Sequence, residues 1–321
     1  MHATCRRARG GQQTTFSRAR VQSDRMHRFL STAASRLNDV HFPVPIQRDC
    51  RLSQLGSLAT CFVLLEADTA TQRFIEAGFE RHWLHDLAAE VIAAMLQLCL
   101  TAADANLACN LGQMWVLSTS QARMLCEASG GWTRGRLLDC GAGDGSVTEQ
   151  LAPLATTVVC TEVSNSAAAR LRQRGWACTV EEIPAHQEEQ FDVICCLNVL
   201  CRASRPLSLL RRLRDMLRFD GLMLLAVVIP FEPVVLGRAR TSAPPLEAMP
   251  RALRAARSFE AAAVAFAELV LRPLGLVVAA VSRVPYYSRG THGTYYVLDD
   301  AIFACRRAVA GDAACLQPAD P

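Results

Sequence analysis

A run of ten residues, Arg136–Gly145, constrains the fold of this 321-residue chain more than any other stretch. It opens with Arg-Leu-Leu-Asp, the pattern of a short buried strand that ends in an acid, Asp139. Glycines then occupy alternate positions up to Gly145, and a helix is expected to begin at Ser146. Because glycine alone lets the backbone approach a ligand closely, this strand, glycine turn and helix start predict a nucleotide-binding turn.

The spacing of the glycines within the turn limits which class of ligand it could bind. Asp139, Gly141, Gly143 and Gly145 form Asp-x-Gly-x-Gly-x-Gly, which differs from the Gly-x-Gly-x-x-Gly of dinucleotide-binding folds. An acid at the start of the run suits a ligand with an ammonium group beside an adenosine, which describes S-adenosylmethionine. A glycine-rich turn taken alone is also compatible with a plain structural turn, so the prediction depends on the residues that follow.

From Arg136 onward, strand and helix patterns alternate, as in a parallel sheet with helices on both faces. Strands are expected at residues 136–140, 157–161, 177–180, 191–197 and 222–229, with helices at 145–154, 164–174 and 206–217. Residues 230–250 hold five prolines and are expected as a loop, followed by a helix at 258–271 and an antiparallel pair of strands at 276–284 and 295–304. This order predicts an α/β fold of the class I, Rossmann-like S-adenosylmethionine-dependent methyltransferases, with a seven-stranded, mostly parallel sheet.

We expect four segments along the chain. Residues 1–45 are rich in arginine and almost free of acids, and are expected to form a disordered leader. Its composition fits an organellar transit peptide or a plain basic tail, which leaves mitochondrial and cytoplasmic locations open. Residues 46–130 are expected to form a helical extension that covers the cleft, residues 131–307 the methyltransferase core, and residues 308–321 a disordered tail. The longest apolar run, residues 91–103, is too short to span a bilayer and predicts a buried helix.

Composition excludes several classes of function. The formal charge of +4 is mild, and no interleaving of basic and aromatic residues indicates nucleic-acid binding. The 14 cysteines include no Cys-x-x-Cys pair, and the seven histidines are scattered, so no metal site is expected. The chain is large, and Cys195 and Cys196 lie inside an apolar run, which favours reduced, mostly buried thiols over disulfides.

Candidate site residues follow the predicted strands, because ligands of open α/β sheets lie beyond the carboxyl ends of the strands. Asp144 lies within the glycine run itself and is expected to contribute to binding the cofactor. Glu162 follows the second strand, where a carboxylate can accept from both hydroxyls of a ribose; the alternative is a solvated loop acid. Glu182 and Ile183 follow the third strand and could flank an adenine. Asn198 follows the fourth strand, where an amide can contact both the cofactor and an incoming nucleophile.

Longer motifs add a family resemblance. They lie at residues 71–75, 136–147, 161–162, 191–198, 230–231, 283–286 and 295–301. With these motifs the chain resembles the DREV methyltransferases over about residues 50–307. The run Tyr-Tyr-Val-Leu-Asp-Asp-Ala at 295–301 is the most specific of them, because a generic methyltransferase has no need of it.

The resemblance implies a protein-histidine N-methyltransferase. Such enzymes use S-adenosylmethionine to methylate the pros (Nδ1) nitrogen of histidine in His-x-His sequences of proteins, where x is a small residue. By this resemblance the cofactor would be held by Asp139, Gly141, Gly143 and Glu162.

On the target side, the resemblance implies that Asn198, Tyr286 and Tyr296 face the imidazole. The chain departs from the family at Cys201, because related enzymes carry an aspartate three residues after the asparagine. A neutral thiol is a poor acceptor, so three interpretations stay open: another acid substitutes, the substrate differs, or activity is weak or absent. The alternative functions are accordingly a class I methyltransferase of a small molecule and a cofactor-binding pseudoenzyme.

Overall fold

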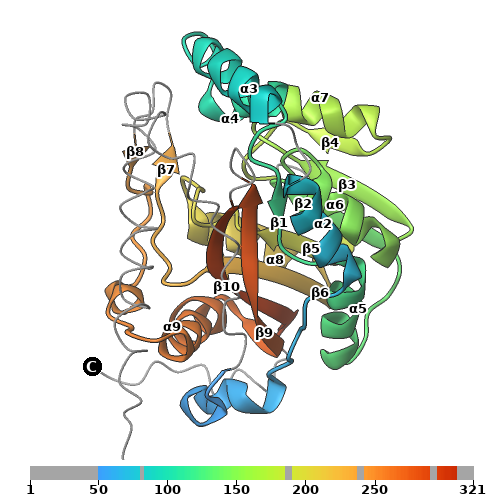
Figure 1. The fold of residues 1–321 in the computed structure, drawn as a ribbon. Helices are drawn as coiled ribbons and strands as arrows, with labels where there is room; N and C mark the ends of the chain where they lie inside the picture. The colour runs from blue at the N-terminus through green and yellow to red at the C-terminus, as the bar shows by residue number, and fades with distance from the viewer. Residues whose placement is uncertain (1–49, 80–82, 185–189, 237–241, 290–294, 309–321) are drawn as a thin grey trace, which may run out of the picture. The chain divides into compact units, whose positions relative to one another are not determined.

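The computed structural model describes residues 50–308, apart from 80–82, 185–189, 237–241 and 290–294. The expected leader at 1–45 and all but the first residue of the expected tail therefore lie outside the described residues. One eight-stranded sheet runs through the described part, with the strand order β1-β9-β10-β6-β5-β2-β3-β4 (Figure 1).

Five parallel strands form the larger part of this sheet. They are β2 (Arg136–Cys140), β3 (Thr157–Thr161), β4 (Ala177–Thr179), β5 (Phe191–Leu197) and β6 (Leu217–Val228). Central strand β2 lies between β3 and β5, where Leu138 is in register with Val159 and Ile194. β6 was expected to begin at residue 222 but begins five residues earlier, at Leu217, which is paired with Phe191 of β5. The parallel strands read as apolar runs because both faces of the sheet are covered.

Two long strands complete the far side of the sheet. β9 (Leu276–Arg289) and β10 (Tyr295–Arg307) are antiparallel, and β10 lies between β9 and β6. The prediction of an antiparallel pair is confirmed, but the expectation of seven strands was wrong. A short strand, β1 (Met114–Trp115), pairs with the outer edge of β9, where Trp115 is in register with Tyr287.

The helices of the core follow the predicted alternation. They are α6 (Ser146–Leu151), α7 (Asn165–Gln173), α8 (Pro206–Met216) and α9 (Phe259–Phe266), which continues through a π-helical turn (Ala267–Leu271) into a 3-10 turn (Arg272–Leu274). A further 3-10 turn, Ala152–Leu154, extends α6. Successive residues of β2 point to opposite faces, so Leu138 packs in the core cluster with Phe266 and Leu137 packs in the one with Leu125.

The described residues of the proline-rich segment after β6 contribute no strand to the main sheet, as its composition predicts. It contains β7 (Val235–Leu236) and β8 (Ser242–Ala243), which pair only with each other, and the 3-10 turn Arg251–Arg254. The cysteine prediction is also confirmed within the described residues, where twelve cysteines are free and seven of them are buried.

The N-terminal extension is helical, as expected. Its elements are the 3-10 turns Leu52–Gln54 and Gly56–Cys61, followed by α2 (Thr69–Phe79), α3 (Trp83–Leu96), α4 (Ala102–Ala108) and α5 (Thr119–Ala128). Ser118 caps α5 with a capping box: its side chain accepts from the backbone of Gln121, whose side chain accepts from the backbone of Ser118.

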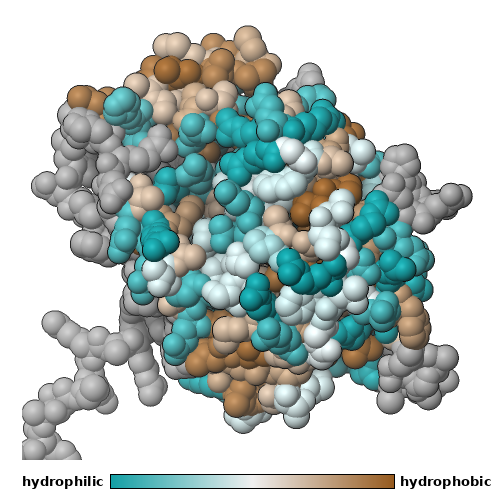
Figure 2. Space-filling model, turned by 90° about the vertical axis from the view of Figure 1, so that its right-hand side faces the viewer, coloured by the Kyte–Doolittle hydropathy of each residue, from teal (hydrophilic) through white to brown (hydrophobic). Residues whose placement is uncertain are grey.

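The prediction of a buried helix at residues 91–103 was wrong. α3 ends at Leu96, and the exposed fractions of Ile92, Met95 and Leu98 are 51%, 63% and 86%. Only part of α3 packs inward, with Ala93 buried, and Figure 2 shows the apolar side chains gathered at the top of the view. No helix of the described part is long and apolar enough to span a membrane.

Candidate active site

The glycine turn after β2 is hydrogen-bonded to the end of β3. The backbone N–H groups of Gly141 and Ala142 both donate to the carbonyl oxygen of Thr161, at 2.9 and 3.1 Å. The φ angles of Gly141, Gly143 and Gly145 are +71°, +58° and +83°, in the left-handed region that favours glycine. The turn therefore needs glycine at all three alternate positions.

The three glycines differ in what surrounds them. A Cβ atom on Gly141 would lie 2.5 Å from Cγ2 of Val199, and one on Gly145 would lie 2.9 Å from both Leu171 and Trp176. A Cβ atom on Gly143 would meet no heavy atom within 4 Å. The first and third glycines thus permit close packing, while Gly143 borders open space in which a ligand could approach the backbone.

Glu162 and Gly143 lie together, as the sequence predicts. Oε2 of Glu162 accepts the backbone N–H of Gly143 at 2.8 Å, and Oε1 accepts the N–H of Ser164 at 3.0 Å. A carboxylate has about four lone-pair sites, so two acceptor positions stay free after these bonds. The arrangement fits a ribose whose two hydroxyls donate to this acid.

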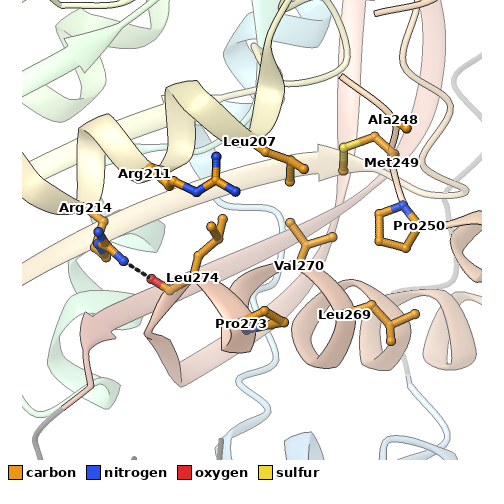
Figure 3. A pocket seen from close by; sticks show the side chains of 10 residues that line it. All are labelled: Leu207, Arg211, Arg214, Ala248, Met249, Pro250, Leu269, Val270, Pro273 and Leu274. Carbon is orange, nitrogen blue, oxygen red and sulfur yellow. Dashed lines mark hydrogen bonds between the residues drawn. The ribbon is translucent and has the colours of Figure 1, made fainter. Parts of the chain in front are cut away.

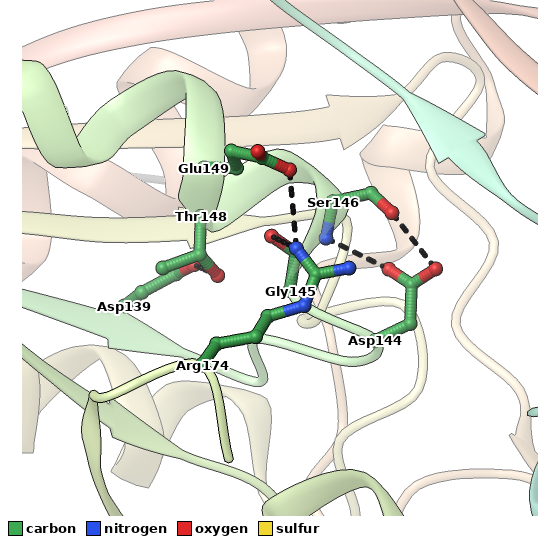
Figure 4. A network of polar contacts seen from close by, with 7 residues as sticks. All are labelled: Asp139, Asp144, Gly145, Ser146, Thr148, Glu149 and Arg174. Carbon is green, nitrogen blue, oxygen red and sulfur yellow. Dashed lines mark hydrogen bonds and ion pairs between the residues drawn. The ribbon is translucent and has the colours of Figure 1, made fainter. Parts of the chain in front are cut away.

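Asp139 is buried at the end of β2. Its Oδ2 accepts the hydroxyl of Thr148 at 2.6 Å (Figure 4). Burial raises the pKa of Asp139 from its ordinary 3.8 to about 7, and the nearby charge of Glu162 adds to this rise. An ammonium group placed beside Asp139 would favour the ionised carboxyl, which fits the amino-acid end of S-adenosylmethionine.

Asp144 has a local structural role. Its Oδ1 accepts the backbone N–H of Ser146 at 2.9 Å, and its Oδ2 accepts the Ser146 hydroxyl at 2.8 Å, at the start of α6. Figure 4 also shows Arg174 reaching this helix start, where it contacts Glu149 at 3.1 Å. The carboxylate of Asp144 therefore holds the helix start, next to the glycine turn.

Glu182 and Ile183, predicted to flank adenine, have other partners. The carboxylate of Glu182 accepts the backbone N–H of Ser204, and its hydroxyl at 2.8 Å. Ile183 is partly buried against the core cluster that contains residues of α8. These contacts tie the segment after β4 to the segment after β5, and an adenine role for the two residues stays a prediction.

Asn198 occupies a strained position directly after β5. Its φ is +60°, uncommon for a residue other than glycine, and its backbone N–H donates to Ala226 of β6 at 2.9 Å. Its side-chain Nδ2 donates to Oδ2 of Asp300 at 2.5 Å. The amide oxygen Oδ1 is buried and has no hydrogen-bond partner.

Cys201 and Tyr286 lie beside this pair. Sγ of Cys201 donates to the carbonyl oxygen of Asn198 at 3.3 Å, and the hydroxyl of Tyr286 contacts Sδ of Met114 in β1. Burial raises the pKa of Cys201 and that of Tyr286, and the charge of Asp300 raises both further, so both groups are neutral. We refer to Asn198, Cys201, Tyr286 and Asp300 as the acceptor cluster.

One contact and one electrostatic interaction place the acceptor cluster beside the glycine turn. Val199, the neighbour of Asn198, lies against Gly141. Tyr286 is close enough to Asp144 for the aspartate charge to raise its pKa. The turn after β2 and the residues after β5 thus form one site at the carboxyl ends of the strands.

Strand β10 carries two residues that bear on the site. Tyr296, expected to face the target, is in register with Ser288, but its side chain lies outside the described part of the structure. Asp300 is a site residue that the sequence did not reveal, although it lies in the 295–301 motif. Two adjacent acids within the strand were the available signal, but the partner of Asp300, Asn198, is two strands away.

Among the described residues, neither a metal-type cluster nor the pocket beside α8 adds a residue to this site. No group of three or more His, Cys, Asp or Glu residues in the described ranges could hold a metal ion. A pocket of about 430 Å³ lies between α8 and the helical turns after α9. Arg214 donates to the carbonyl oxygen of Leu274 there at 2.8 Å (Figure 3). None of its lining residues belongs to the glycine turn or to the acceptor cluster.

The fold and the site together define the class of protein. The protein has the fold of a class I S-adenosylmethionine-dependent methyltransferase. This class is defined by the strand order, by the glycine turn after the central strand and by the acid after the neighbouring strand. A family model of the DREV methyltransferases matches residues 49–307, and the chain belongs to this family.

Other known proteins are similar over parts of the chain. A ubiquinone biosynthesis O-methyltransferase from Parvibaculum lavamentivorans is 32% identical over 101 residues, which are 29% of this chain and 40% of that protein. Among solved structures, the ribosomal protein L11 methylase from Lactobacillus delbrueckii subsp. bulgaricus is 17% identical with a TM-score of 0.37, over 62% of this chain and 83% of that one. The glycopeptide N-methyltransferase MtfA, complexed with S-adenosylmethionine, is 16% identical with a TM-score of 0.39, over 60% and 88% of the two chains.

Proposed function

We propose that this methyltransferase transfers the methyl group of S-adenosylmethionine to the pros nitrogen of histidine in His-x-His sequences of proteins. The observation that carries the proposal is Oδ1 of Asn198, a buried acceptor without a partner in the acceptor cluster. Such an atom needs a donor, because an unpaired buried polar group costs about 1–3 kcal/mol. A neutral imidazole supplies one N–H donor and, on its other nitrogen, one lone pair for attack.

The chemistry asks little of the enzyme beyond placement. The cofactor supplies an electrophilic methyl group on a sulfonium. Imidazole has a pKa of about 6.5, so at neutral pH much of it is already an unprotonated nucleophile and no base has to act first. When Oδ1 of Asn198 accepts the N–H of the tele nitrogen, the pros nitrogen is left with the lone pair. The amide would thereby select which nitrogen reacts, and alignment would supply most of the acceleration.

The methylated ring is a cation, so negative charge beside it would lower the barrier. Cys201 is not suited to this task, because its thiol is held neutral by burial. Asp300 is a carboxyl in the same cluster, bonded to Asn198, and it would supply this charge in its ionised form. This supports the first of the three interpretations of Cys201, in which another acid substitutes for the aspartate of related enzymes.

A paired assay tests the proposal. Wild type and Cys201→Asp are incubated with labelled S-adenosylmethionine and a peptide that contains His-Ala-His, with an Ala-Ala-Ala peptide as control. S-adenosylhomocysteine binding is measured by calorimetry on the same samples. We expect label on the His-Ala-His peptide alone, with the methyl group located on Nδ1 by NMR.

Each other outcome would reject the proposal in a different direction. Transfer by Cys201→Asp but not by wild type would favour a cofactor-binding pseudoenzyme. Transfer by neither protein, despite cofactor binding, would favour a different substrate such as a small molecule. Methylation on the tele nitrogen would contradict the role given to the Asn198 amide.

A further inference from the structure

Asp300 is an unusual acid within its own strand. Its neighbour Asp299 forms a buried ion pair with Arg283 at 2.6 Å. Asp300 is 0% exposed and forms no ion pair among the described residues. Its Oδ2 accepts the hydrogen bond from Asn198, and its Oδ1 has no partner. Burying a carboxyl with so few partners is costly, which indicates a use beyond packing.

The sheet explains how the two side chains meet. Successive residues of a strand point to opposite faces, so Asp299 and Asp300 face different sides of β10. Asp300 is in register with Val228 of β6, while the backbone of Asn198 is bonded to Ala226 of the same strand. The end of β6 therefore lies between the two residues, and their side chains join at 2.5 Å.

The bond fixes the orientation of the Asn198 amide. An ionised carboxylate can only accept hydrogen bonds, so only the NH₂ end of the amide can face it. The amide oxygen must then point the other way, as an acceptor without a partner. The backbone bond to Ala226 prevents the residue from adjusting by moving as a whole.

We propose that Asp300 is a positioning residue that holds the Asn198 side chain so that Oδ1 is presented to the N–H of the methyl acceptor. The identity of that acceptor rests on the proposed function; the orientation of the amide does not. Asp300 acts through Asn198, which is the group that would touch the acceptor.

The orientation depends on the protonation of Asp300. Burial raises the pKa of Asp300 from 3.8 to about 8, and the charge of Asp299 adds to this rise. The groups that face it from other elements are Cys201 and Tyr286, both neutral at this pH. Arg202 also acts on these two groups, and Asp144 on Tyr286.

A protonated Asp300 can donate to the amide oxygen as well as accept from the amide nitrogen, so the amide is free to turn. Only the ionised form leaves a single orientation. The rate of transfer should therefore rise as the pH passes through about 8, above the pKa of about 6.5 of free imidazole.

Asp300→Asn is the decisive variant, with Asp299→Asn as its matched control. The introduced asparagine side chain can accept from or donate to the Asn198 amide, so it no longer fixes one orientation. We expect kcat on the His-Ala-His peptide at pH 9 to fall about tenfold or more, and the step near pH 8 to disappear. Binding of S-adenosylhomocysteine should stay within about threefold. Asp299→Asn removes the buried ion pair with Arg283, so it should lower the unfolding temperature but keep the step in the pH profile.

A second measurement needs no substrate. In ¹⁵N-labelled full-length protein, the side-chain NH₂ signals of Asn198, assigned by their loss in Asn198→Ala, should shift between about pH 6 and 10 with a midpoint near 8. The shift should be absent in Asp300→Asn. Unchanged signals across this range, or an unchanged pH profile in Asp300→Asn, would overturn the inference. If the NH₂ signals titrate but wild type modifies no histidine peptide, the inference stands and the proposed substrate fails.

Discussion

Gly143 donates its backbone N–H to Oε2 of Glu162 at 2.8 Å, so a hydrogen bond joins the turn after β2 to the acid after β3. The residue with open space beside it is thereby coupled to the acid that fits a ribose. A substitution of either residue should therefore disturb the position of the other. Variants that keep the fold can still test the two contributions to ligand binding one at a time.

The open space beside Gly143 predicts that Gly143→Arg abolishes S-adenosylhomocysteine binding. Gly175→Arg is the matched control, because Gly175 also has a positive φ of +89° and a Cβ atom there would meet no heavy atom within 4 Å. Both variants should lose about 1–2 kcal/mol of folding free energy from the left-handed backbone. Calorimetry should detect binding of S-adenosylhomocysteine to Gly175→Arg and none to Gly143→Arg. Equal binding to both variants would contradict the placement of the ligand at this turn.

The packing of Gly141 against Val199 predicts a compensating pair of variants. In Gly141→Ala the new Cβ would lie 2.5 Å from Cγ2 of Val199, which should cost about 1–3 kcal/mol in addition to backbone strain. Adding Val199→Ala removes that atom and should restore part of the loss. Urea denaturation of the two single variants and the double variant measures this coupling. Strictly additive losses would show that the two residues do not press on each other.

The two bonds accepted by Glu162 predict that Glu162→Gln weakens S-adenosylhomocysteine binding about tenfold or more, which is about 1.4 kcal/mol. Glutamine keeps one acceptor oxygen, and its NH₂ end would face a backbone N–H of Gly143 or Ser164. The control is Glu181→Gln, because Glu181 accepts from the Thr179 hydroxyl at 2.6 Å in the segment after β4. A similar loss of affinity in both variants would argue for a general charge effect.

The buried Asp139 predicts a pH-dependent stability. Its pKa is about 7 in the folded protein and ordinarily 3.8, so between these values the folded state binds more protons than the unfolded state. This contribution to stability is complete below about pH 4 and is lost as the pH rises through 7. Asp139→Asn should therefore be more stable than wild type at about pH 8, by more than about 1 kcal/mol.

Chemical denaturation at about pH 5 and about pH 8 measures this difference, and equal pH slopes for both proteins would contradict it. Ligand binding gives a further check on the same residue. Because an ammonium group favours the ionised carboxyl, wild-type affinity for S-adenosylhomocysteine should rise as the pH passes through about 7. The affinity of Asp139→Asn should show no such rise.

Local pattern is sufficient to predict much of the fold. β2, β3 and β5 begin and end at the predicted residues, because each is an apolar run bounded by turn residues. The exposure of α3 could not be predicted, because hydropathy does not tell which side of an apolar helix has a partner. The place of β1 in the sheet could not be predicted either. This strand has only two residues, and tertiary structure, not local sequence, decides whether so short a segment pairs.

The same limit applies to the site. Gly143 and Glu162 could be placed together from strand order alone, since consecutive parallel strands end at one edge. Asp300 could not be joined to Asn198 in this way, because the bond depends on β10 entering the sheet antiparallel next to β6. The partners of Glu182 likewise come from the segment after β5, which no local pattern identifies.

The edge of β9 bears on whether a shortened form of the protein would stay free of aggregation. Its backbone is covered by the N-terminal extension at two places: Val63 donates to Val281 at 2.8 Å, and Arg289 donates to Gln113 at 2.8 Å beside β1. A fragment trimmed to residues 131–307 would lose both covers and expose one side of a 14-residue strand. An open strand edge of that length is a template for pairing with another chain, so the trimmed catalytic core should aggregate where the longer chain does not.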